Sequence, residues 1–232
     1  SVVMGQKNQL WWDIPASESF LLNQKIYEIP EIQYKNTLDE LVDLLSVREK
    51  LNVQVRRLSL GERMKMEFIA ALLHKPKIVL LDEPTIGLDV ISQLKIREFV
   101  KYYNEKYKTT FLLTSHYMHD IQALCKRVFV IHKGASLYDG DFNDLVNRVN
   151  PKRKLLFEFN EIPDKSKTER LSENYSFRLD DTILYAELPD KELTKLVSDL
   201  FQLGVPASIT MEDLPVEDTM RSFFKDPEKF LK

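Results

Sequence analysis

Cysteine and long apolar stretches are what this sequence has least of. Its one cysteine, Cys125, cannot form a disulfide within the chain, which is typical of the cytosol and argues against secretion. The longest apolar run, Phe68–Leu73, is far shorter than the roughly 20 residues of a membrane-spanning helix. The chain does not open with a basic segment followed by an apolar one, so we see no signal peptide. We therefore predict no membrane span, and any work at a membrane would need a partner.

The sequence also lacks a marked excess of either charge. It has 33 Lys and Arg residues against 36 Asp and Glu, for a formal net charge of −3. A general nucleic-acid binder carries a clear basic excess, so we predict no nucleic-acid partner. The length of 232 residues allows one large domain or two small ones, each with a real core.

Apolar patterns in the first 148 residues alternate between strand and helix. The continuous apolar run Ile78–Leu81 predicts a strand covered on both faces, as in a parallel sheet, and Thr110–Thr114 predicts another buried strand. Residues 1–6 resemble the end of a strand, and Lys133-Gly134 predicts the turn of a closing hairpin. The alternation favours an α/β unit with right-handed crossovers. We predict helices over about 17–27, 37–45 (capped by Asn36 or Thr37), 61–74, 91–107 (with Leu94, Phe99, Val100, Tyr103 and Tyr107 inward) and 117–125.

A polar break at residues 150–154 predicts a second domain over 151–232. There we expect strands at 155–159, 175–179, 183–188 and 205–211, with helices at 191–203 and 215–224. Gly204 is a suitable stop for the first of these helices. The pattern predicts a small α+β domain, and we find no set of catalytic residues in it.

Two adjacent carboxylates, Asp82 and Glu83, follow the strand Ile78–Leu81. In a parallel sheet they would lie at the carboxyl edge, where open α/β folds bind ligands. In a P-loop nucleotide hydrolase, Asp82 would hold Mg²⁺ and Glu83 would polarise the attacking water as general base. The alternative is that both residues merely begin a turn before Pro84.

Three further positions extend the candidate site. Ser59-Leu60-Gly61-Glu62 opens a helix, whose free N–H groups and positive dipole end suit a phosphate, although Ser59 could also be an ordinary cap. His116 follows the second strand, where it could donate to a phosphate and fix Glu83, or simply be structural. Asp89 ends the segment Gly87-Leu88-Asp89 that follows the carboxylates.

In this order, the motifs resemble those of the ATP-binding subunit of ABC transporters, over roughly residues 1–145. The family's signature, LSGGQ, corresponds to Leu58-Ser59-Leu60-Gly61-Glu62, its Walker B strand to Ile78–Asp82, its catalytic glutamate to Glu83, its D-loop to 87–89, its switch histidine to His116 and its Q-loop to Gln6, with Gln9 as the alternative. The resemblance implies ATP and Mg²⁺ as cofactors, with Asp82 and Gln6 at the metal. It also implies that residues 59–62 and Asp89 contact nucleotide or the opposite subunit.

The resemblance has two departures. Leu60 and Glu62 replace residues of the usual signature, while Ser59 and Gly61 are retained. The phosphate-binding pattern G-x-x-x-x-G-K-[ST] occurs nowhere in the 232 residues. We therefore expect an N-terminally truncated domain that does not hydrolyse ATP alone.

The resemblance implies a P-loop NTPase-like sheet over 1–148, with a helical subdomain over about 10–75. Expected partners are a transmembrane permease subunit and a second ATPase subunit, identical or paired, on the cytoplasmic face of the membrane. The tract Gln6–Pro15, with Trp11 and Trp12, and the 151–232 domain resemble an exporter-type branch. Alternatives are a soluble ABC-type ATPase and a non-enzymatic remnant that binds its partner.

Overall fold

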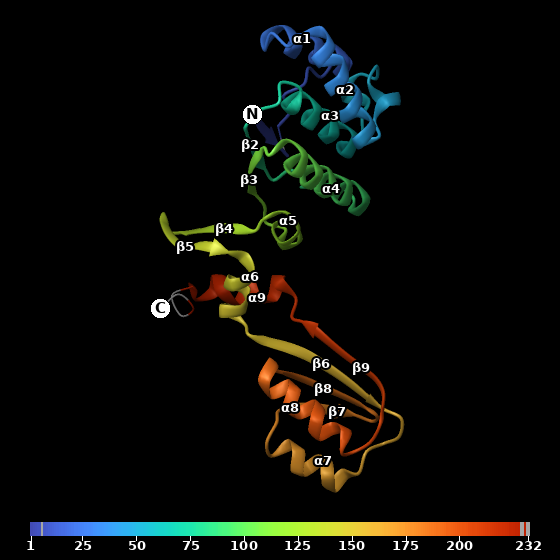
Figure 1. Ribbon diagram of the computed structural model, residues 1–232, viewed down its shortest axis with the longest axis vertical. Helices are drawn as coiled ribbons and strands as arrows, with labels where there is room; N and C mark the ends of the chain where they lie inside the picture. Colours follow the sequence, from blue (N-terminus) through green and yellow to red (C-terminus); the bar gives the residue numbers. More distant parts are fainter. Residues whose placement is uncertain (6, 228–229, 231–232) are drawn as a thin grey trace. The chain divides into compact units, whose positions relative to one another are not determined.

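The computed structural model describes residues 1–5, 7–227 and 230, and the chain divides into two compact units, 1–125 and 126–232 (Figure 1). The division falls before the hairpin that begins at Arg127. The functional boundary that we predict near residue 150 stays a prediction.

A parallel three-stranded sheet forms the centre of the first unit. Its order is β1 (Val2–Met4), β2 (Ile78–Asp82) and β3 (Thr110–Thr114). The register places Met4, Asp82 and Thr114 level with one another. The predicted parallel α/β core is therefore confirmed, and the carboxyl ends of β2 and β3 reach the same edge.

Only one face of this sheet is buried in the part of the chain that the structure describes. Val3, Val79 and Leu81 belong to the core, whereas Ile78 and Leu112 are 57% and 62% exposed. Our prediction of a strand covered on both faces was wrong for β2, and our prediction of a buried strand was wrong for β3, none of whose residues is buried. An unbroken apolar run is compatible with either one or two covered faces, so periodicity alone could not decide.

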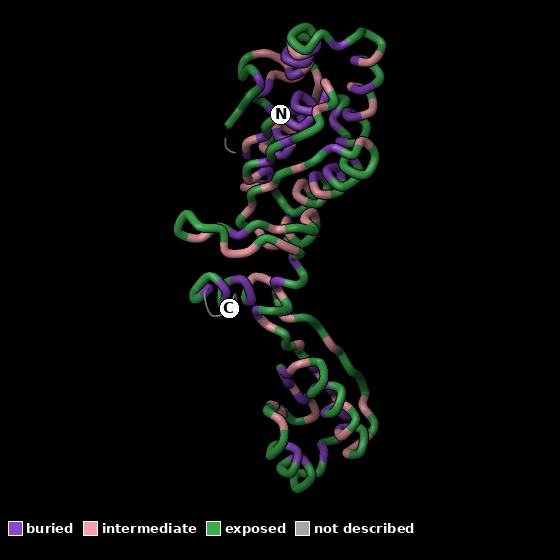
Figure 2. Tube along the Cα trace, turned by 60° about the vertical axis from the view of Figure 1, so that its left-hand side comes forward, coloured by how far each residue is buried: buried purple, intermediate pink, exposed green. Residues whose placement is uncertain are grey.

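The described part of the first unit also contains five α-helices and two short 3₁₀ turns. They are α1 (Ala16–Ile26), α2 (Glu31–Leu45), η1 (Arg48–Lys50), η2 (Val55–Arg57), α3 (Leu60–Leu72), α4 (Val90–Tyr107) and α5 (Met118–Leu124) (Figure 1). Residues of α2, α3 and α4 share one core with the buried face of the sheet, and Figure 2 shows this buried interior in purple. None of the helices in the described part of the chain is both long and apolar enough to cross a bilayer.

Two helix predictions need correction. The helix α2 starts at Glu31 after Pro30, so Asn36 and Thr37 lie inside it rather than at its cap. Proline fixes φ near the value that a helix entry needs, so Pro30 marks the start of the helix. We placed the start later because we relied on apolar periodicity, which begins only at Leu38. In α4, Leu94 is 49% exposed because the buried stripe runs through Ile96, Phe99, Val100 and Tyr103, and Leu94 lies on another face.

The second unit begins with a hairpin, which is followed by the helix α6. The strands β4 (Arg127–His132) and β5 (Ala135–Asp141) are antiparallel, and the turn residues Lys133 and Gly134 both have positive φ, as a tight hairpin requires. The predicted hairpin is confirmed. The helix α6 (Phe142–Val149) packs on the last helix, α9 (Val216–Lys225).

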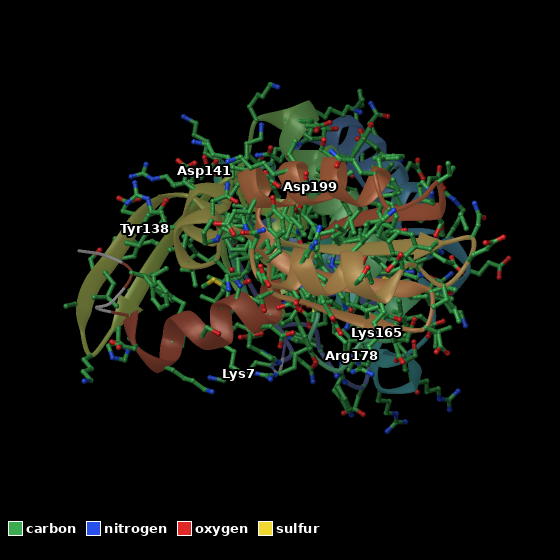
Figure 3. All side chains as sticks on the ribbon, turned by 90° about the horizontal axis from the view of Figure 1, so that it is seen from below. Lys7, Tyr138, Asp141, Lys165, Arg178 and Asp199 are labelled. Atoms are coloured by element: carbon green, nitrogen blue, oxygen red, sulfur yellow. The ribbon has the colours of Figure 1, made fainter. Side chains whose placement is uncertain are left out.

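The residues that follow α6 and precede α9 along the chain form a four-stranded antiparallel sheet in the order β7-β8-β6-β9. The elements are β6 (Lys152–Phe159), α7 (Lys165–Ser172), β7 (Phe177–Asp180), β8 (Ile183–Pro189), α8 (Asp190–Phe201) and β9 (Pro206–Asp213). This β-α-β-β-α-β order is ferredoxin-like. Asp199 of α8, labelled in Figure 3, accepts a hydrogen bond from the hydroxyl of Tyr175 at 3.0 Å. The sequence did not predict α7, because its buried residues, Thr168 and Leu171, are too few to show helical periodicity.

Candidate active site

Asp82 ends β2 at the carboxyl edge of the parallel sheet. Its carboxylate Oδ1 accepts a hydrogen bond from Thr114 Oγ1 of β3 at 2.7 Å, and its carbonyl accepts one from the Gly5 amide at 2.8 Å. Asp82 is therefore fixed from both neighbouring strands. Mg²⁺ is commonly bound by one or two carboxylates together with substrate phosphates, so this carboxylate fits the metal that the sequence implies. Among the described residues, no three His, Cys, Asp or Glu side chains gather around a common point that could hold a metal.

Glu83 has a left-handed backbone conformation, with φ of 51°. This backbone conformation is uncommon for residues other than glycine, asparagine or aspartate, and it often marks a functional site. The amide of Glu83 donates to the Thr114 carbonyl at 3.0 Å, which holds the turn against β3. A Cβ atom on Gly5 would lie 2.0 Å from the Glu83 carbonyl oxygen, so only glycine allows β1 to pass this turn.

The side chain of Glu83 meets His116. Its Oε2 lies 2.7 Å from His116 Nδ1 and also accepts a hydrogen bond from the His116 amide at 3.3 Å. Both side chains are partly exposed, so the pair is accessible from solvent. The structure thus brings together the two residues that the sequence predicts as catalytic, although they lie on different loops.

The Ser59 turn forms a reciprocal cap at the start of α3. Ser59 Oγ accepts from the Glu62 amide at 3.2 Å, and Glu62 Oε2 accepts from the Ser59 amide at 2.9 Å. The Ser59 N–H chiefly holds the pKa of Glu62 below its usual value, and Lys50 at 3.0 Å adds to this. Ser59 is therefore an N-cap, as the alternative in our sequence analysis had it, and two of the expected free N–H groups are occupied. Phosphate binding by residues 59–62 stays a prediction.

Asp89 caps α4 in a similar way. Its carboxylate accepts from the Ser92 amide at 2.9 Å and from the Ser92 hydroxyl at 2.7 Å, and the hydroxyl bond is the main cause of its lowered pKa. Gly61 of the signature turn lies so close that a Cβ there would be 2.6 Å from Ser92 Oγ. Leu60 lies against Gly87, whose φ is 72°. The Ser59 turn (residues 59–62) and the Asp89 turn (residues 87–92) therefore pack directly on each other.

Gln6, our Q-loop residue and second metal ligand, lies outside the described residues. The alternative residue, Gln9, donates from its side chain to the Val2 carbonyl at 2.8 Å. The backbone amide of Gln9 donates to the buried carboxylate of Glu67 at 2.9 Å. The side chain of Gln9 is therefore turned back onto β1.

The sequence did not point to Asp120, which is fully buried beside the candidate catalytic pair. Its carboxylate accepts from Thr85 Oγ1, from Ser115 Oγ at 3.1 Å and from Arg97 Nε at 2.6 Å. A single Asp on a helix usually faces solvent, so only its place four residues after His116 could have drawn attention to it.

Comparisons with known proteins relate part of this chain to a protein family. The family model described as ABC transporter matches residues 2–86. The ABC transporter ATP-binding protein NatA of Bacillus subtilis is 34% identical over 62% of this chain and 58% of its own length. Over these residues the chain is similar to ABC transporter ATP-binding proteins.

A second relative and a solved structure extend the match along the chain. The bacitracin transport ATP-binding protein BcrA of Bacillus licheniformis is 32% identical over 70% of this chain and 51% of its own length. The chain thus spans somewhat more than half of these curated relatives. A solved ATP-binding subunit of an ABC transporter shares the fold, with a TM-score of 0.55 and 22% identity over 63% of this chain and 60% of that chain.

Proposed function

We propose that the first unit binds ATP and Mg²⁺ and contributes to ATP hydrolysis as part of a transporter's ATP-binding subunit. The observation that carries this proposal is the 2.7 Å contact between Glu83 and His116 beside Asp82. Glu83 would accept a proton from the attacking water, and His116 would hold its carboxylate in place. Bound Mg²⁺, held by Asp82, would neutralise charge on the phosphates.

The contact also constrains the proton on His116. An ionised carboxylate only accepts hydrogen bonds, so Nδ1 carries the proton in the contact with Glu83.

The phosphates need donors beyond those in these 232 residues, because the G-x-x-x-x-G-K-[ST] pattern does not occur among them. We propose that two subunits, identical or paired, enclose each nucleotide between such a segment and Ser59–Gly61. Asp89 would contact the opposite subunit. The packing of Gly61 on Ser92 supports a joint movement of the two turns.

We propose that the membrane partner is a permease that docks on the groove beside α1. This pocket, of about 340 Å³, is lined among others by Leu10, Trp11, Leu22, Ile26 and Tyr27. Trp11 is 60% exposed, which is unusual for a tryptophan without an apolar partner. The unit would then lie at the cytoplasmic face of the membrane, in an exporter-type assembly. The names of NatA and BcrA support a role in transport.

ATP binding and turnover test the proposal in two proteins. One is the 232-residue chain, and the other is a chimera that adds a G-x-x-x-x-G-K-[ST] segment from a related subunit before Ser1. We expect no turnover from the chain alone and measurable turnover from the chimera. Glu83→Gln in the chimera should lower kcat by about 100-fold or more, because it removes the general base, and leave ATP binding intact.

The matched control is Glu98→Gln, which changes an exposed glutamate on α4. It should leave kcat unchanged. Turnover by the chimera that does not depend on Glu83 would contradict the proposed mechanism. Nucleotide binding without any turnover would favour a non-enzymatic partner-binding protein instead.

A further inference from the structure

We propose that Asp120 is a positioning residue that fixes the Glu83 loop relative to the His116 loop. Arg97 is its charge partner. The inference rests on the proposed function for the roles of Glu83 and His116. The contacts that carry it are those of the buried carboxylate alone.

In the described part of the chain, the Glu83 loop and the His116 loop are joined by backbone only at their start. Among the described residues, the last backbone hydrogen bond between the β2 and β3 segments runs from the Glu83 amide to the Thr114 carbonyl. Beyond it, each loop leaves the sheet by itself. The direct contacts of Glu83 with His116 are made by partly exposed side chains, so a buried contact between the two loops would add to their order.

Asp120 supplies this contact from α5. One oxygen, Oδ2, accepts from Thr85 in the Glu83 loop and from Ser115 in the His116 loop. Ser115 lies directly before His116, and its hydroxyl also accepts from the Tyr117 amide at 3.0 Å. A single carboxylate oxygen thus joins both loops, one on each side of the candidate catalytic pair.

The carboxylate charge is what lets three donors meet at this point. A buried carboxylate is costly unless it is paired and hydrogen-bonded. Arg97 lies 2.6 Å from Oδ1 and is itself largely buried. An asparagine would replace one acceptor oxygen by an N–H₂ group and turn it toward a hydroxyl or the guanidinium, so Asp120→Asn should loosen one or both loops.

Arg97 extends the connection to α4. Its guanidinium donates to Gln93 Oε1 at 3.1 Å, and Gln93 Nε2 donates to the Leu88 carbonyl at 3.1 Å. Leu88 directly precedes Asp89. The same network therefore joins the Asp89 turn to the loops of Glu83 and His116, so a shift of that turn would reach the pair through Arg97 and Asp120.

The test is the NMR signature of the His116 ring in the full chain without nucleotide. A carboxylate-bound Nδ1 proton resonates far downfield, and Glu83→Gln defines the value without this partner. We expect Asp120→Asn to move the His116 ring resonances at least halfway toward those of Glu83→Gln. The control, Asp139→Asn, breaks an exposed ion pair with Arg127 and should move nothing.

A folded Asp120→Asn chain with wild-type His116 resonances would overturn the proposal. Should that variant not fold, Ser115→Ala and Thr85→Val each release one loop and decide the matter in the same way. The NMR result is independent of ATP turnover, so failure of the proposed function and failure of this inference are distinguishable. In the active chimera, Asp120→Asn should lower kcat by roughly 10- to 100-fold, as expected for a misplaced catalytic group.

Discussion

The two units differ in where they place polar side chains. The first unit buries charged groups, among them Asp120 and Glu67, and burial raises the pKa of Glu67 above its usual value. In the described part of the second unit, the buried polar side chains are the hydroxyls of Thr168 and Thr219. Burying a charge is costly, so such groups are kept where geometry matters more than stability. The contrast supports our proposal that the active site lies in the first unit.

The largest expected effect comes from the core of the second unit. Phe157 is fully buried there, so Phe157→Ala should cost about 3–5 kcal/mol of its free energy of unfolding. Both tryptophans, Trp11 and Trp12, lie in the first unit, so their fluorescence reports on that unit, whereas circular dichroism reports on both. We expect a shifted circular-dichroism transition and an unchanged fluorescence transition. Equal shifts would mean that the units unfold as one and would break the comparison.

Helix caps provide an intermediate effect in each unit. Asp89 caps α4, and Asp141 caps α6 by accepting from the amides of Asn143 and Asp144 at 2.8 and 3.1 Å. Alanine at either position should cost about 0.5–2 kcal/mol of unfolding free energy, measured by denaturant titration. Only Asp89→Ala should also lower ATP turnover in the chimera. A loss of turnover with Asp141→Ala would assign function to the second unit as well.

The smallest expected effect is the pH dependence of the Ser59 cap. The folded-state pKa of Glu62 is lowered, chiefly by the Ser59 amide, so its stabilising effect is present above the unfolded-state pKa. This effect is lost as the pH falls through the folded-state pKa. Glu62→Gln should therefore be less stable than the wild type at pH 7, by a few tenths of a kcal/mol, and equal to it in acid. A difference that stays constant with pH would contradict the assigned cause, and Glu98→Gln serves as control.

Local patterns predicted most of the elements but not their surroundings. The run Ile78–Leu81 followed by two acids predicted β2 and the strand end that carries the candidate site, because strand and turn signals are local. The same run could not tell that Ile78 would be exposed, since that depends on what covers the sheet. Helix α7 was missed because a short polar helix has little periodicity to detect.

The candidate site was predictable only where order along the chain suffices. Glu83 and His116 follow adjacent strands, and adjacent parallel strands end at one edge, so their meeting could be expected. Asp120 depends on how α5 and α4 pack over the strand ends, which no spacing reveals. At Ser59 the local pattern was compatible with both a phosphate-binding turn and a helix N-cap, and the contacts show an N-cap.

The pairing of β6 with β9 sets Arg153 opposite Asp213, so the chain leaves α6 and returns to α9 at nearly the same place. The segment between these two positions is a subdomain inserted between α6 and α9, and it has its own hydrophobic core. Such a segment can be lengthened, shortened or exchanged during evolution while α6 and α9 keep their mutual packing. This segment is also suited to replacement by a fluorescent or sensing module, because its two ends lie side by side and the flanking helices need not move.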